Sequence, residues 1–132
     1  MESDKNTEPI KLLLVDDEEG FVNVVSKRMA KRNIDVTKAF SGTQALQALR
    51  KKEFHVVVLD LKMEDMDGIE VLKILKKVDS NLAVIMLTGH GSERAARDGI
   101  KFGAIDYLTK PCDFEDLLKK VNEAYNIRKN NI

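Results

Sequence analysis

Short apolar runs alternate with segments of helical hydrophobic spacing along this sequence. The runs of strand length are Lys11–Val15 (KLLLV), Ile34–Ala39 (IDVTKA), Val56–Leu59 (VVVL), Ala83–Leu87 (AVIML) and Ile105–Leu108 (IDYL). The first, third and fourth runs are almost continuously apolar, as in parallel strands covered on both faces. The second alternates apolar and polar residues and the fifth is short and mixed. These two runs are therefore predicted near the edges of a sheet.

Apolar residues at helical spacing fill the gaps between these runs. The residues predicted to face inward are Phe21, Val24, Val25 and Met29; Ala45, Leu46, Ala48 and Leu49; Ile69, Val71, Leu72 and Leu75; Ala95, Ala96 and Ile100; and Phe114, Leu117, Leu118, Val121 and Tyr125. Ser41 followed by Gln44 forms a capping box, and Asp113 is expected to cap the last helix. The fourth helix has the thinnest apolar face.

Strict alternation of strands and helices with short links predicts right-handed crossovers and one parallel sheet. The fold class is therefore α/β, a single doubly wound, flavodoxin-like domain of five strands with helices on both faces. Residues 11–129 are assigned to this domain, residues 1–10 to a disordered polar lead-in and residues 130–132 to a tail.

Composition narrows the functional classes. The 22 basic and 22 acidic residues give zero formal charge, which does not favour nucleic-acid binding. The lone Cys112 cannot form an internal disulfide. No apolar run approaches a membrane span, and the N-terminus lacks the apolar core of a signal peptide. We therefore predict a soluble, cytoplasmic domain with no membrane insertion and no direct contact with nucleic acid.

Polar residues follow several of the predicted strands at their carboxyl ends, where ligands bind in such sheets. They are Asp16 and Asp17 after the first run, Asp60 after the third, Thr88 after the fourth and Lys110 after the fifth. Taken singly, each has a structural explanation: Asp17 as a helix cap, Asp16 or Thr88 as a turn residue, Asp60 as a solvated loop carboxylate and Lys110 as a surface lysine.

Taken together, the same residues indicate a site. Three carboxylates from two neighbouring strands raise each other's pKa unless a cation lies among them. Oxygen ligands without histidine or thiol suit Mg²⁺, which readily shares its ligand shell with a phosphate. Lys110 adds a second positive charge and Thr88 a hydroxyl donor. The set predicts a phosphoryl-transfer pocket in which an aspartate is the nucleophile.

These motifs resemble the receiver domain of two-component response regulators. The matching features are D-D after the first strand, D after the third, L-T-G after the fourth and Y-L-T-K-P after the fifth. The resemblance extends from Lys11 to about Lys129. It implies that Asp60 accepts a phosphoryl group from a sensor histidine kinase or a histidine phosphotransfer protein. The protein would then be a signalling switch that catalyses only its own phosphorylation and dephosphorylation.

The resemblance also assigns roles around the pocket. It implies that Mg²⁺ is held by Asp16, Asp17, Asp60 and the backbone carbonyl of Lys62. Thr88 and Lys110 would contact the phosphoryl oxygens, and the peptide between Lys110 and Pro111 would be cis. Tyr107 would move on activation. We therefore expect the surface of the fourth helix, fifth strand and fifth helix to bind an unknown downstream protein.

Some residues near the pocket depart from the family or remain outside its chemistry. Met63 is followed by Glu64 where many receivers carry proline. Asp65 and Asp67 are expected to be structural. Lys62 and His90 are expected to flank the path of a water that attacks the phosphorylated Asp60.

Three other classes of protein fit less well. A flavin-binding module needs a Ser/Thr-rich phosphate loop after the first strand, where Asp16-Asp17-Glu18-Glu19 would repel a phosphate. An aspartate-nucleophile phosphatase needs D-x-D there, and this chain has Asp16-x-Glu18. The complete acidic set argues against a receiver-like adaptor that is never phosphorylated. Whether the chain acts alone or belongs to a longer regulator stays open.

Overall fold

The computed structural model describes residues 8–89 and 93–131 of the 132-residue chain. Within these ranges, strands and helices alternate strictly: β1 (Ile10–Val15), α1 (Glu19–Ala30), β2 (Ile34–Ala39), α2 (Gly42–Lys51), β3 (Val56–Asp60), α3 (Gly68–Val78), β4 (Ala83–Thr88), α4 (Glu93–Lys101), β5 (Asp106–Thr109) and α5 (Phe114–Asn130). The strand order is β2-β1-β3-β4-β5, and every neighbouring pair is parallel. The predicted fold is confirmed, with β2 and β5 at the edges.

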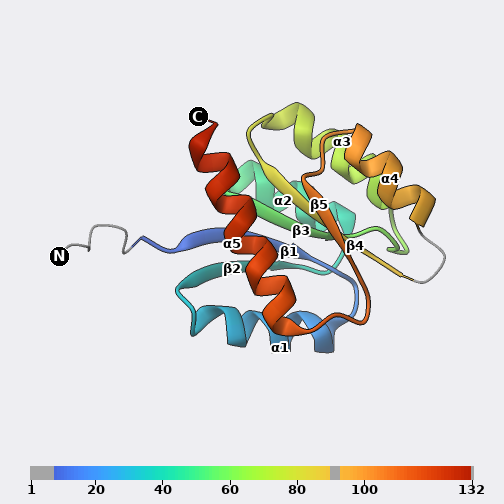
Figure 1. Cartoon of the computed structure of the whole chain (residues 1–132). Coiled ribbons are helices and arrows are strands. Elements are labelled where there is room, and N and C mark those ends of the chain that lie inside the picture. The colour runs from blue at the N-terminus through green and yellow to red at the C-terminus, as the bar shows by residue number, and fades with distance from the viewer. Residues whose placement is uncertain (1–7, 90–92, 132) are drawn as a thin grey trace.

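Helices cover both faces of the sheet, with α1 and α5 on one side and α2, α3 and α4 on the other (Figure 1). Successive strand residues point to opposite faces. Leu12 and Leu14 of β1 therefore pack in the core under α1 and α5, whereas Leu13 and Val15 pack under α2 and α3. This two-sided burial explains why the central strands are almost continuously apolar.

The rotation of two helices differs from the prediction. In α1, Val22 is buried and Val24 is 59% exposed, although Val24 was expected inside. In α4, Ile100 is 42% exposed, while Ala96 and Gly99 face the sheet. A Cβ atom on Gly99 would lie only 2.0 Å from the Met86 sulfur, so a larger residue at this position would require the Met86 side chain to move. The buried face of α4 therefore consists of small residues, and its larger apolar residue Ile100 lies outside that face.

The helix starts follow the predicted caps in part. Ser41 Oγ accepts a hydrogen bond from the Gln44 N–H at 3.1 Å, which confirms Ser41 as the N-cap of α2. The returning bond differs from a capping box by one residue, because Gln44 Oε1 accepts from the Phe40 N–H at 2.8 Å and not from the Ser41 N–H. Asp113 occupies the cap position of α5, but its side chain makes no capping hydrogen bond.

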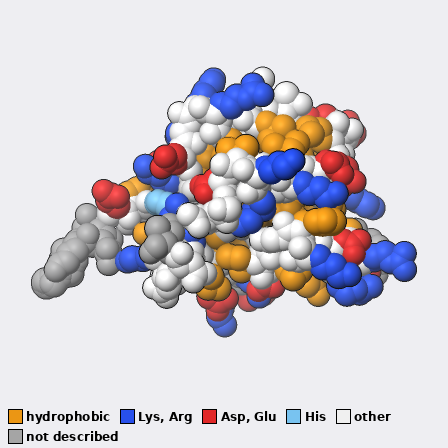
Figure 2. Space-filling view, turned by 90° about the horizontal axis from the view of Figure 1, so that it is seen from above, with side chains coloured by type: hydrophobic (Ala, Val, Ile, Leu, Met, Phe, Trp, Pro, Cys, Tyr) orange, Lys and Arg blue, Asp and Glu red, His pale blue; other side chains and the backbone are white. Residues whose placement is uncertain are grey.

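The surface carries both signs of charge. Figure 2 shows basic and acidic side chains interspersed on one face, with hydrophobic side chains between them. This mixture agrees with the zero formal charge of the sequence. No helix in the described part of the chain is both long and apolar enough to cross a membrane.

Candidate functional site

The carboxyl ends of the central strands bring three predicted acids together. Val15 of β1 pairs with Leu59 of β3, so the residues that follow them lie side by side. Carboxylate oxygens of Asp16, Asp17 and Asp60 all lie within 4.8 Å of one another. Asp16 and Asp60 are buried, and Asp17 is exposed. The cluster therefore opens to solvent on the side of Asp17.

Asp60 is the strand-end acid of β3. Its Oδ1 accepts a hydrogen bond from the Lys62 N–H at 3.1 Å. Burial raises the pKa of Asp60 to about 6; the Lys62 hydrogen bond opposes this rise, and the negative charge of Asp16 adds to it. Burial is thus the main cause of the raised pKa of Asp60, and the negative charges of Asp16 and Asp17 add to it while the positive charge of Lys110 opposes it.

Lys110 reaches this cluster from the end of β5. Its Nζ donates to Asp16 Oδ2 at 2.9 Å and to Glu18 Oε1 at 2.5 Å, and it lies 3.9 Å from Asp60 Oδ2. Burial by itself would lower the pKa of Lys110, but the hydrogen bonds to Glu18 and Asp16 outweigh it and raise the pKa above its usual value. The peptide between Lys110 and Pro111 is cis, as predicted.

Thr88 ends β4 at the same edge of the sheet and is 2% exposed. Its Oγ1 donates a long hydrogen bond of 3.4 Å to the Leu108 carbonyl, and its own carbonyl accepts from the Lys110 N–H at 2.7 Å. Tyr107, next to Leu108 on the edge strand, is 39% exposed. Thr88 therefore links the pocket edge to β5.

The loop between β3 and α3 is held tightly beside Asp60. Residues Lys62 and Asp67 form an isolated bridge, and the Gly68 N–H donates to the Leu61 carbonyl at 3.2 Å. Asp67 Oδ1 accepts from the Ile69 N–H at 3.0 Å and caps α3, which confirms a structural role for this acid. A Cβ atom on Gly68 would lie 2.5 Å from Leu61 Cα. Only glycine permits this approach of the two backbones.

Two acids have contacts that the sequence pattern did not predict. Asp65 is exposed, yet its carboxylate accepts hydrogen bonds from the Gly42 N–H, the Thr43 N–H and the Thr43 hydroxyl at 3.0, 3.0 and 2.9 Å. These bonds lower the pKa of Asp65 and tie the loop to the start of α2. Glu18 accepts a hydrogen bond from Lys110, and in the sequence only its position directly after Asp16 and Asp17 indicated that it lies near the site. His90 lies outside the described residues.

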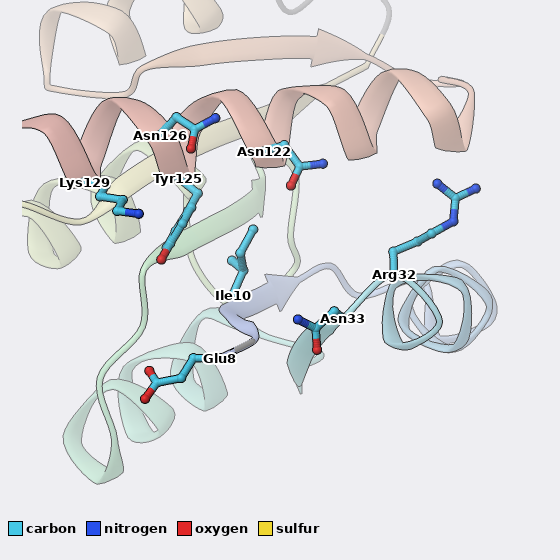
Figure 3. Close-up of a pocket in the computed structure, with 8 residues that line it drawn as sticks. All are labelled: Glu8, Ile10, Arg32, Asn33, Asn122, Tyr125, Asn126 and Lys129. Atoms are coloured by element: carbon cyan, nitrogen blue, oxygen red, sulfur yellow. The ribbon is translucent and has the colours of Figure 1, made fainter. Parts of the chain in front are cut away.

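A second hollow lies at the opposite end of the sheet, where β1 begins, and has a volume of about 290 Å³ (Figure 3). Asn122, Tyr125 and Lys129 of α5 line one side of it. Glu8 is the only carboxylate among its lining residues. This hollow therefore offers nothing comparable to the acidic cluster, and the candidate site is the one at the carboxyl ends of the strands.

Comparison with known proteins supports the same conclusion. The family model of the response regulator receiver domain matches residues 12–122, which is most of the chain. The chain belongs to this family. Receiver domains are signalling modules of two-component systems and are not enzymes that act on a separate substrate. The geometry of Asp16, Asp17 and Asp60 is typical of the acidic metal site of such domains.

Individual relatives show the extent of the likeness. The transcriptional regulatory protein ZraR of Klebsiella oxytoca is 36% identical over 117 residues, which cover 89% of this chain and 26% of that protein. A response regulator receiver domain protein of Clostridium thermocellum shares 33% identity with a TM-score of 0.88, covering 93% of this chain and 99% of that one. A CheY-like receiver domain protein of Methanospirillum hungatei shares 25% identity with a TM-score of 0.90, covering 95% and 100%. The receiver chain thus spans about a quarter of the length of curated relatives such as ZraR.

Proposed function

We propose that this receiver domain is a phosphorylation-dependent switch that accepts a phosphoryl group on Asp60 from a phosphohistidine. The donor would be a sensor histidine kinase or a histidine phosphotransfer protein. The observation that carries this proposal is the position of Asp60, a buried strand-end carboxylate whose Oδ2 lies 3.9 Å from the Lys110 ammonium and beside Asp16 and Asp17. A cytoplasmic location, where such a kinase presents its histidine, is part of the same proposal.

The transfer itself is a displacement at phosphorus. An oxygen of ionised Asp60 forms a bond to phosphorus while the bond from phosphorus to the donor histidine nitrogen breaks. The electron pair of that bond stays on the imidazole nitrogen, which can take up a proton from water. Asp60 is fixed at the end of a rigid strand, and this fixed position supports the in-line approach that the displacement needs.

The acidic cluster fits a divalent cation. Its donors are carboxylate oxygens within 4.8 Å of one another, and the pKa of Asp60 is raised to about 6 because of burial and surrounding negative charge. A hard cation such as Mg²⁺ relieves that charge. Asp16, Asp17, Asp60 and the backbone carbonyl of Lys62 would hold it, the last by family resemblance. When bound, Mg²⁺ neutralises charge that develops on the transferred group.

The chain's own polar groups complete the pocket. The Lys110 ammonium would pair with a phosphoryl oxygen, and the Thr88 hydroxyl would donate to another. Thr88 would then give up its long hydrogen bond to the Leu108 carbonyl, which at 3.4 Å is weak in the unphosphorylated protein. This exchange would transmit the modification from the pocket to β5.

The output surface in this proposal is the face made by α4, β5 and α5. Helix α4 buries only Ala96 and Gly99, so little apolar contact holds it in place. Ile100 of α4 and Tyr107 of β5 are 42% and 39% exposed. These side chains are available to a downstream protein whose affinity would change when Tyr107 turns and α4 repacks.

Intact-mass measurement after incubation with Mg²⁺ and acetyl phosphate tests the chemistry. The wild-type chain should gain one phosphoryl group that hydroxylamine removes, and Asp60→Asn should gain none. Glu64→Gln is the matched control, because it neutralises an exposed acid of the neighbouring loop, and it should be modified like wild type. Full modification of Asp60→Asn would exclude Asp60 as the acceptor.

A further inference from the structure

Lys110 is proposed to pair with a phosphoryl group on Asp60, but its hydrogen bonds are to two other acids. Its ammonium has three N–H donors. One binds Asp16 Oδ2 at 2.9 Å and another binds Glu18 Oε1 at 2.5 Å, whereas Asp60 Oδ2 lies at 3.9 Å. The last distance exceeds hydrogen-bonding range. In the unphosphorylated protein the lysine is therefore bonded to the segment between β1 and α1.

The two acids that bind Lys110 differ in their exposure. The Asp16 side chain is 0% exposed and that of Glu18 is 63% exposed. Separating Lys110 from Asp16 would leave a buried carboxylate with one partner fewer, which is costly. Separating it from Glu18 returns an exposed carboxylate to water at little cost. Glu18 is thus the partner that Lys110 can exchange.

The main chain of Glu18 is fixed beside the pocket while its carboxylate is not. Glu18 occupies the cap position of α1, but its side chain makes no capping hydrogen bond. Its N–H donates to Asp16 Oδ1 at 3.0 Å, and its carbonyl accepts from the Val22 N–H at 3.1 Å. The carboxylate is therefore available for Lys110.

The surroundings leave space for this exchange. A hollow of about 380 Å³ is lined by Glu18, Phe21, Lys110, Pro111 and Cys112. The Phe21 ring centre lies 4.9 Å from Lys110 Nζ and covers one side of the ammonium. The Glu18 side chain borders this hollow and is 63% exposed, so its carboxylate can turn away from Lys110 into solvent.

We propose that Glu18 is a positioning residue that competes with the phosphoryl group on Asp60 for Lys110. This inference rests on the proposed function of Asp60. A phosphoryl group brings roughly −1.5 to −2 charges to the pocket and attracts the lysine, which must first give up Glu18. Glu18 thereby weakens the binding of a phosphoryl group in the resting protein, although it does not touch that group itself.

Binding of beryllium fluoride in the presence of Mg²⁺, measured by isothermal titration calorimetry, tests this competition. Beryllium fluoride mimics a phosphoryl group on a carboxylate. Glu18→Gln should bind it about two- to fivefold more tightly than wild type, which is the scale of an ion pair with one exposed partner. Glu19→Gln is the matched control, because it removes the same charge from the next residue, and it should bind like wild type. An equal gain in both variants would overturn the proposal.

Two further measurements separate a role through Lys110 from a general effect of charge. In the Lys110→Met background, Glu18→Gln should produce no gain, and a gain of the same size there would overturn the proposal. In the free protein, the carbon-bound ε resonances of Lys110 should shift in Glu18→Gln and not in Glu19→Gln. Unchanged resonances in Glu18→Gln would show that the contact does not exist in solution.

The same titrations distinguish this inference from the proposed function. If wild type binds beryllium fluoride, Asp60→Asn does not, and Glu18→Gln binds like wild type, the competition is refuted while the function of Asp60 stands. If wild type binds no better than Asp60→Asn, both are refuted.

Discussion

Gly68 offers a direct test of how the loop beside Asp60 is built. A Cβ atom at this position would lie 2.5, 2.8 and 2.9 Å from the Cα, O and C atoms of Leu61. Ordinary contacts of a Cβ atom begin at 3.4 Å, and these three atoms are backbone that no side-chain rotation can move. In Gly68→Ala the loop and the start of α3 must therefore separate.

The loss of stability expected for Gly68→Ala follows from the contacts between the loop and α3 that the substitution disturbs. Overpacking against backbone costs about 1–3 kcal/mol. Weakening the hydrogen bond from the Gly68 N–H to the Leu61 carbonyl adds about 1 kcal/mol. The lower entropy of the unfolded alanine chain offsets about 0.4–1 kcal/mol. Gly68→Ala should therefore lower the free energy of unfolding by about 1–3 kcal/mol.

Urea unfolding followed by circular dichroism measures this change. The midpoint should fall by roughly 1 M, given the usual slope for a small domain. Gly20→Ala is the control, because a Cβ atom there would meet nothing within 4 Å and the variant should be neutral or slightly more stable. Phosphorylation of Gly68→Ala should also slow, since the shifted loop carries the Lys62 N–H that binds Asp60. A Gly68→Ala midpoint equal to that of Gly20→Ala would refute the reasoning.

Two other expectations concern the metal and the response to pH. Asp17→Asn should weaken Mg²⁺ binding by roughly tenfold, about 1.4 kcal/mol, because it removes a charged ligand; equal affinities in a calorimetric titration would exclude Asp17 from the site. Burial, followed by the charges of Arg128 and Lys11, lowers the pKa of His55, whose Nδ1 accepts the Lys11 N–H at 3.0 Å. The His55 imidazole therefore binds a proton more readily in the unfolded chain than in the folded protein. As the pH drops through about 6.5 towards the lower pKa of the folded state, the free energy of unfolding should fall. Urea unfolding between pH 7 and 5.5 should show a smaller decrease in the free energy of unfolding for His55→Gln than for wild type. Identical pH dependence in the two proteins would contradict the lowered pKa of His55.

The sequence alone determined which strands lie at the centre of the sheet, which lie at its edges, and at which end of the sheet the site is found. Runs such as VVVL are typical of strands in the middle of a parallel sheet, and the helical segments between the runs indicate that helices cover both faces of that sheet. Parallel strands end at a common edge, so the acids after β1 and β3 had to lie together once that sheet was recognised. Asp16, Asp17 and Asp60 therefore needed no tertiary information to be grouped, and their oxygens do lie within 4.8 Å of one another.

The tertiary structure decided which side chains face which neighbours. Val22, Val24 and Val25 are all apolar, and only the rotation of α1 on the sheet places Val24 in solvent. Ile100 is 42% exposed because α4 turns Ala96 and Gly99 towards the sheet, with Gly99 next to the Met86 side chain. Helical spacing restricts such choices without deciding them, since neighbouring positions differ by only about 100° around a helix axis.

The partner of Lys110 could not be predicted from the sequence for a related physical reason. Its ammonium is within reach of three carboxylates, and differences of about an ångström between segments 92 and 94 residues apart decide that it binds Glu18 and Asp16 instead of Asp60. Asp65 likewise binds the N–H groups of Gly42 and Thr43 at the start of α2, which are 23 and 22 positions away in the sequence. Sequence pattern groups the charges of this pocket, whereas distances set by the packed sheet and helices determine how those charges are paired.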